Sequence, residues 1–313
     1  TPQALAYAML AGLPPVVGLY ASLVPLVVYT LLGSSATLSV GPMAVVSLMT
    51  ASALSQVAES GSSDYIAAAL VLALLSGAIL LIMGLCRLGF LVNFLSHPVM
   101  TGFVSASGVL IAASQLKQLL GVELSGSTLP ALLSRLPSAL GDVSLPTVVI
   151  GLGSLLLLWL IRRWGKPALE RCRVPARAAG VLVKLAPIAT IVLAALVASA
   201  AGWLGRDVAV IGEIPAGLPP LTLPDWEPEL WRSLIGLAVL ISIVGYVESV
   251  SVAQALAVRR GERVDPDQEL IGLGGANLAA AFTGGMPITG GFSRSVVNFD
   301  AGARTPASSA FTA

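Results

Sequence analysis

Residues 284–295 read Gly-Gly-Met-Pro-Ile-Thr-Gly-Gly-Phe-Ser-Arg-Ser, and residues 33–47 read Gly-Ser-Ser-Ala-Thr-Leu-Ser-Val-Gly-Pro-Met-Ala-Val-Val-Ser. In both stretches, small residues and a proline accompany an extended segment, and a short helix follows. A proline suits a first helical turn, because its missing N–H is not needed there. Paired broken segments, one early and one late in a chain, indicate a transporter with inverted repeats and a site near the membrane midplane. We therefore predict two half-helices, each preceded by a short extended stretch.

The composition places this chain in a membrane. Of its 313 residues, 56% are hydrophobic and 11% are charged, and the mean hydropathy is +0.91. A soluble domain usually carries about 25% charged residues, so these values exclude an ordinary soluble enzyme, a nucleic-acid binder and a disordered chain. A membrane-spanning helix needs roughly 20 apolar residues. The length therefore allows about ten spans with short loops.

The apolar runs predict an all-α polytopic membrane protein. The ten predicted segments cover about 1–12, 16–32, 42–57, 65–86, 98–116, 145–162, 179–203, 232–257, 268–283 and 290–302.

The loops after the fourth, sixth and eighth segments carry most of the basic residues, so the positive-inside rule makes that side cytoplasmic, together with the N-terminus. These basic residues are Arg87, Arg162, Arg163, Lys166, Arg171, Arg173, Arg177, Lys184, Arg259, Arg260 and Arg263.

The two half-helix starts predict an anion site. Each start leaves unpaired N–H groups and a partial positive charge. Two such ends that converge would bind an anion, and Arg294 would add a full positive charge. The alternative is a glycine-rich bend that packs on another helix, but an arginine inside the membrane is costly without a purpose.

Glu248 is the second charged group expected inside the membrane. It follows more than a dozen mostly apolar residues and lies eleven residues before Arg259, about 16 Å at helical rise. Burial disfavours the charged form of a carboxyl group, so Glu248 could carry a proton or pair with Arg294. The alternatives are a structural ion pair and a helix-end acid near Arg259 and Arg260.

Other motifs exclude several kinds of site. The glycines of residues 272–275 lack the preceding strand and the lysine of a nucleotide loop, and they indicate close helix packing instead. Cys86 and Cys172 lie far apart and form no disulfide framework. The single His97 cannot build a multi-histidine metal site. We therefore expect no metal, no cofactor and no enzymatic activity.

Several motifs, taken in order along the chain, resemble the SulP family of sulfate permeases and related anion transporters. They include Pro-Gln-Ala-Leu-Ala-Tyr-Ala at 2–8, Gly-Tyr-Val-Glu-Ser-Val-Ser at 245–251 and Pro-Ile-Thr-Gly-Gly-Phe-Ser-Arg-Ser-Val-Val-Asn at 287–298. Residues 11–20, 33–35 and 39–42 match as well. The resemblance implies the UraA-like fold, which has fourteen membrane segments in two inverted repeats of seven.

By this resemblance, both ends of the chain are cuts through a longer protein, and the chain holds segments one to ten. The core comprises about 1–90 and 230–313, the gate comprises about 91–205, and a periplasmic loop covers about 204–231. The last gate segments and a C-terminal STAS domain would lie outside this sequence.

The resemblance also implies an anion site between the starts of segments three and ten. Matched by motif, the substrate-binding residues are Gln3, Tyr7, Gly41, Pro42, Met43, Gly291, Phe292, Ser293, Arg294 and Ser295, with Glu248 as the proton-coupling group. Some members have an aromatic residue where Met43 stands, and this difference leaves the identity of the anion open.

The function implied is proton-coupled uptake of sulfate by an elevator-like motion of core against gate. A bicarbonate or C4-dicarboxylate transporter and an anion channel are the alternatives. The expected partners are an inorganic anion, protons, membrane lipid and a second copy in a homodimer, without nucleic acid. The expected location is the bacterial inner membrane.

Overall fold

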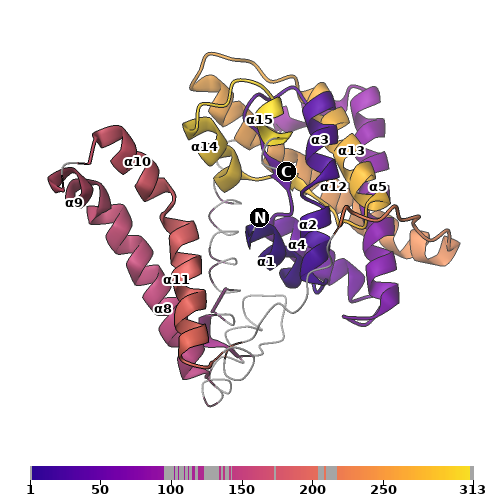
Figure 1. Cartoon of the computed structure of the whole chain (residues 1–313). Coiled ribbons are helices and arrows are strands. Elements are labelled where there is room, and N and C mark those ends of the chain that lie inside the picture. The colour runs from indigo at the N-terminus through magenta and orange to yellow at the C-terminus, as the bar shows by residue number, and fades with distance from the viewer. Residues whose placement is uncertain are drawn as a thin grey trace. The chain divides into compact units, whose positions relative to one another are not determined.

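The computed structural model describes residues 2–94, 143–172, 174–203 and 217–310, together with scattered positions between these ranges (Figure 1). The chain divides into two compact units. The first comprises Thr1–Ser107 with Ile214–Ala313, and the second comprises Gly108–Glu213.

The described residues of the first unit form helices and two very short strands. Its helices are α1 (Pro2–Leu10), α2 (Pro15–Tyr20), α3 (Val24–Leu32), α4 (Ala44–Leu54), α5 (Ser63–Leu85), the 3₁₀ helix η1 (Leu88–Phe94), α12 (Pro228–Val258), α13 (Pro266–Phe282), α14 (Phe292–Asp300) and α15 (Ala307–Ala310). Its strands are β1 (Val40–Gly41) and β2 (Thr289–Gly290). The core forms where α13 packs against α5 and α3, and where α12 packs against α5.

Glycines allow α5 and α13 to approach closely. A Cβ atom on Gly77 would lie 2.7 Å from the backbone nitrogen of Leu278, and one on Gly274 would lie 2.8 Å from that of Leu81. Gly272 similarly faces the backbone of Gly33. The close helix packing predicted for residues 272–275 is confirmed.

The second unit contains α8 (Leu145–Leu160), the π-helix η3 (Ile161–Gly165), α9 (Lys166–Arg171), α10 (Ala176–Lys184) and α11 (Ala186–Ala200). The prediction that a loop holds Arg162, Arg163, Lys166 and Arg171 was wrong. They lie on a continuous helical run, Leu145–Arg171, because the π-helical turn carries the helix past Gly165 instead of ending it.

Four helical runs are long and apolar enough to cross a membrane among the residues described: Pro15–Leu32, Ser63–Leu85, Leu145–Arg171 and Pro228–Val258. Every predicted segment other than 98–116 overlaps a described helix, and most of 98–116 lies outside the described residues. The total of ten segments stays a prediction.

Two predicted segments are interrupted by prolines. The range 16–32 is broken between α2 and α3, where Pro25 occupies the first turn of α3. The range 179–203 is broken at Leu185, where Pro187 occupies the first turn of α11. A proline has no N–H and its ring clashes with the preceding turn, so each helix restarts there.

The glycine contacts predict a difference between two Gly→Ala variants. Gly274→Ala should lower the free energy of unfolding by about 1–3 kcal/mol, because its new methyl group meets backbone atoms of α5 that cannot move aside. Gly236→Ala on α12 should be nearly neutral, since no described atom outside the local helix backbone lies within 4 Å of its added Cβ. Melting temperatures of the two purified variants test this, and equal values would contradict it.

Candidate functional site

The two extended stretches quoted above meet as a two-stranded antiparallel ribbon. Val40 pairs with Gly290, and Gly41 pairs with Thr289. The ribbon continues in a further backbone contact, since the Gly291 N–H donates to the Ser39 carbonyl at 3.1 Å. Segments about 250 residues apart in sequence are thereby joined, and the helix after each strand starts from this ribbon.

Both helices that leave the ribbon are short. Helix α4 has 11 residues and α14 has 9, which correspond to about 16 Å and 14 Å at helical rise. A bilayer core is about 30 Å thick. The residues preceding them, Met43 and Gly291, have extended backbones and make no side-chain cap hydrogen bond. First-turn N–H groups that lack a side-chain cap are suited to binding an anion.

Each helix start places a side chain against a glycine of the other stretch. A Cβ atom on Gly41 would overlap Nη1 of Arg294, and one on Gly291 would overlap the sulfur of Met43. Only glycine permits these approaches. The guanidinium of Arg294 is thereby held against the backbone that leads into α4.

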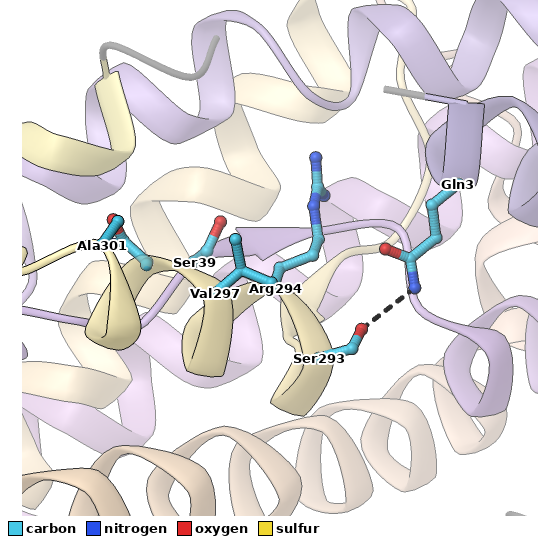
Figure 2. A pocket seen from close by; sticks show the side chains of 7 residues that line it. Gln3, Ser39, Ser293, Arg294, Val297 and Ala301 are labelled. Atoms are coloured by element: carbon cyan, nitrogen blue, oxygen red, sulfur yellow. Dashed lines mark hydrogen bonds between the residues drawn. The ribbon is translucent and has the colours of Figure 1, made fainter. Parts of the chain in front are cut away.

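A cavity of about 360 Å³ opens beside α14 (Figure 2). Among the described residues, its lining has one cation and no carboxylate and consists of Gln3, Ser39, Ser293, Arg294, Val297, Asn298 and Ala301. The Gln3 amide donates to the Tyr7 hydroxyl at 2.9 Å and to Ser293 Oγ at 3.2 Å. Figure 2 shows the second of these bonds joining α1 to α14.

Arg294 carries the main electrostatic feature of the site. Its Nη1 is buried and has no hydrogen-bond partner in the described part of the chain. A buried donor without a partner is costly, and a buried guanidinium is normally paired. The arrangement can therefore accept an anion that supplies the missing acceptors.

The predicted substrate-binding residues fall into three groups. Gln3, Ser293 and Arg294 line the cavity, and Tyr7 contacts Gln3. Gly41, Pro42, Met43 and Gly291 are buried around the ribbon. The other two predicted residues lie elsewhere.

Ser295 is fully buried and acts within the ribbon, where its Oγ accepts from the Ser39 N–H at 2.9 Å and donates to the Gly291 carbonyl at 2.6 Å. The Phe292 side chain is 56% exposed and does not line the cavity. Phe292 therefore marks the start of α14 without facing the candidate site.

Glu248 does not line the cavity either, but it lies beside the residues that fasten α12 to β2. Ser249 Oγ accepts from the Gly290 N–H at 2.7 Å and bonds to Thr289 Oγ1 at 2.7 Å. Thr289 Oγ1 also donates to the Gly245 carbonyl. Glu248 Oε2 is buried without a hydrogen-bond partner among the described residues.

Sequence reasoning missed several residues of this site. Val297, Asn298 and Ala301 line the cavity at spacings of three, four and seven residues from Arg294. That spacing places them on one face of a helix, so it could have identified them. His97 lies outside the described residues. Among the described residues, no group of three or more His, Cys, Asp or Glu side chains could hold a metal ion.

Comparisons with known proteins agree on one family. The family model described as "Sulfate permease family" matches residues 1–313. The chain is 38% identical, over 99% of its length, to sulfate transporter 4.1, chloroplastic, of Arabidopsis thaliana. It is 37% identical, over 97% of its length, to a probable sulfate transporter of Mycobacterium tuberculosis. It spans 44% and 51% of the lengths of these relatives.

Solved structures share the fold. The transmembrane domain of the cyanobacterial bicarbonate transporter BicA superposes with a TM-score of 0.80, 23% identity and coverage of 99% of this chain and 76% of that chain. The murine Solute Carrier 26 family member A9 anion transporter, in its inward-facing state, gives a TM-score of 0.83 at 24% identity, with coverage of 98% and 52%. The chain is mostly helical and has the same fold as the membrane domains of these two transporters.

Proposed function

The chain belongs to the sulfate permease family, and we propose that it forms the anion-binding part of a secondary active transporter that takes up sulfate together with protons. Sulfate is proposed because the relatives at 37–38% identity are named as sulfate transporters. We also propose that the protein is integral to the bacterial inner membrane and that its N-terminus faces the cytoplasm.

One observation carries the proposal. Nη1 of Arg294, in the first turn of α14, lies against Gly41, shortly before α4 begins, and has no hydrogen-bond partner among the described residues. Sulfate has two negative charges and four acceptor oxygens. The guanidinium fork and the Ser293 hydroxyl could each donate to it, together with first-turn N–H groups. Gln3 contacts the same Ser293 hydroxyl, because its amide donates to Ser293 and to Tyr7. Charge-assisted hydrogen bonds of this kind are strongest where water is largely excluded.

We propose that Glu248 couples the anion to a proton. Its buried position disfavours the charged form, whereas the positive site on the neighbouring ribbon favours it. A bound anion would offset that positive field, so the carboxyl group would take up a proton as the anion binds. Linkage then requires that protonation tighten anion binding by the same factor.

We propose an elevator-like motion for the full-length protein, with residues 1–90 and 230–313 as the moving core and 91–205 as the gate. The proposal is supported by the position of the site, since all of its residues belong to the first compact unit. Such a site can move as one body. The full UraA-like arrangement of two inverted repeats, and a homodimer, belong to the same proposal.

Removal of the guanidinium should weaken anion binding more than folding. Arg294→Ala should raise the apparent Km for sulfate by about 10- to 100-fold, the value expected for one or two charge-assisted hydrogen bonds. Arg294→Lys should recover part of the affinity, because it keeps a charge but loses the planar fork. Labelled sulfate uptake into proteoliposomes of the full-length protein measures this, with the exposed Arg259→Ala as control.

An unchanged apparent Km in Arg294→Ala would mean that the arginine is structural and that the anion binds elsewhere. Non-saturable sulfate flux in the wild type would instead favour a channel. Competition between unlabelled bicarbonate or dicarboxylates and labelled sulfate would identify the preferred anion.

Replacement of Glu248 should remove the pH dependence of uptake. Wild-type uptake should rise as external pH falls, because protonated Glu248 favours anion binding and supplies the coupled proton. Glu248→Gln resembles the protonated form, so it should still bind sulfate, yet its uptake should be flat with pH. The measurement is sulfate uptake at several external pH values with the internal pH fixed.

Glu262→Gln is the matched control, since Glu262 is an exposed acid beyond the end of α12 and should keep the wild-type profile. If Glu248→Gln also kept that profile, Glu248 would not be the coupling group.

A further inference from the structure

The two extended stretches contain backbone that neither helix nor sheet fully satisfies. The two stretches are buried at residues 35, 37–43 and 283–291. The pairing of β1 with β2 satisfies backbone groups of only two residues in each stretch. Inside a membrane protein, every such N–H and C=O group needs a partner from the protein. A single helix, α13, supplies partners to both stretches, through Glu269 to the first and through Asn277 to the second.

Glu269 is fully buried and accepts four hydrogen bonds from the segment around the end of α3. The Tyr29 hydroxyl donates at 2.7 Å, and the Ser34 hydroxyl donates at 2.8 Å. The backbone N–H groups of Ser34 and Ser35 also donate, both at 2.8 Å. A carboxylate is costly to bury unless its oxygens are hydrogen-bonded, and here four donors replace water.

A series of hydrogen bonds connects Glu269 to the candidate anion site. Ser35, whose N–H donates to Glu269, accepts through its Oγ from the Leu38 N–H at 3.2 Å. Ser39, the next residue, bonds through its backbone to Ser295 and Gly291 at the start of α14. Ser39 also lines the cavity with Arg294. The position of the Ser34–Ser35 turn therefore influences where the first stretch meets the second.

Asn277 holds the second stretch in the manner of a strand partner. It is 1% exposed, its Oδ1 accepts from the Ile288 N–H at 2.9 Å, and its Nδ2 donates to the Ile288 carbonyl at 2.9 Å. Both polar groups of the residue that precedes β2 are thus bound by one side chain. The remaining amide hydrogen is directed to the Leu273 carbonyl of α13 itself, at 2.9 Å.

We infer that Glu269 and Asn277 are positioning residues that hold the two extended stretches in a fixed relation and so align the starts of α4 and α14. They lie eight residues apart on one helix, about 12 Å along its axis. Neither residue lines the cavity. Helix α13 is itself held by its close packing on α5. The consequence for anion affinity rests on the proposed function, whereas the structural consequence does not.

Hydrogen exchange tests the inference without any anion. In the full-length protein in lipid nanodiscs, we expect Glu269→Gln and Asn277→Asp each to speed amide exchange about tenfold in both stretches, 35–41 and 288–291. Gln presents an NH₂ group to donors, and Asp loses the donor to the Ile288 carbonyl. Glu262→Gln, at an exposed acid before α13, should leave both stretches unchanged. Faster exchange confined to the stretch that each variant touches, or no change, would overturn the inference.

Tyr29→Phe is a milder variant, should Glu269→Gln fail to fold. It removes one of the four donors to Glu269 and should produce a smaller increase in the same two stretches. Unchanged exchange at 288–291 in Tyr29→Phe would count against the inference in the same way.

Sulfate affinity supplies the second readout. Each single variant should weaken sulfate binding several-fold, and the double variant should weaken it by less than the product of the two effects, since both act on one alignment. Variants that lower the melting temperature but keep wild-type affinity and local exchange would have a structural role only. A wild type that binds no sulfate would refute the proposed function, while the exchange result would still decide the inference.

Discussion

The pairing of Val40–Gly41 with Thr289–Gly290 is the constraint on which the site depends. Non-helical backbone inside a membrane protein must find partners within the protein, and each stretch supplies part of what the other lacks. This mutual satisfaction brings together segments from the two ends of the sequence. The surrounding helices α12 and α13 then fix the ribbon through Ser249 and Asn277.

The chemistry of the site follows from this geometry. Helices α4 and α14 both begin within a few residues of the ribbon, and glycines at 41 and 291 let Arg294 and Met43 approach the opposite stretch. The Arg294 Nη1 remains without a partner among the described residues. Among the described residues, the cavity is lined by one cation and no carboxylate, and a helix start adds a partial positive charge.

Local patterns in the sequence were sufficient to predict the two short helices and the extended stretches before them, because glycine and proline are conspicuous within apolar runs. Isolated charges within apolar runs singled out Arg294 and Glu248, whose roles stay predictions. The strand pairing was not predicted, since two-residue strands carry no alternating pattern and their contact is long-range. Glu269 was also missed, because it follows Asp265 and Asp267 and resembles an ordinary acid of a helix first turn. The continuation of the helix from Arg162 to Arg171 was missed because the cluster of basic residues suggested a loop.

We propose that an anion binds between the starts of α4 and α14. The most direct test is a structure of the full-length protein with selenate, a heavier analogue of sulfate whose selenium can be located by its anomalous scattering. We expect selenium density in the cavity beside Arg294 and Ser293, within hydrogen-bonding reach of the guanidinium. Density only at other positions, with Arg294 bonded to protein groups, would contradict binding at this site.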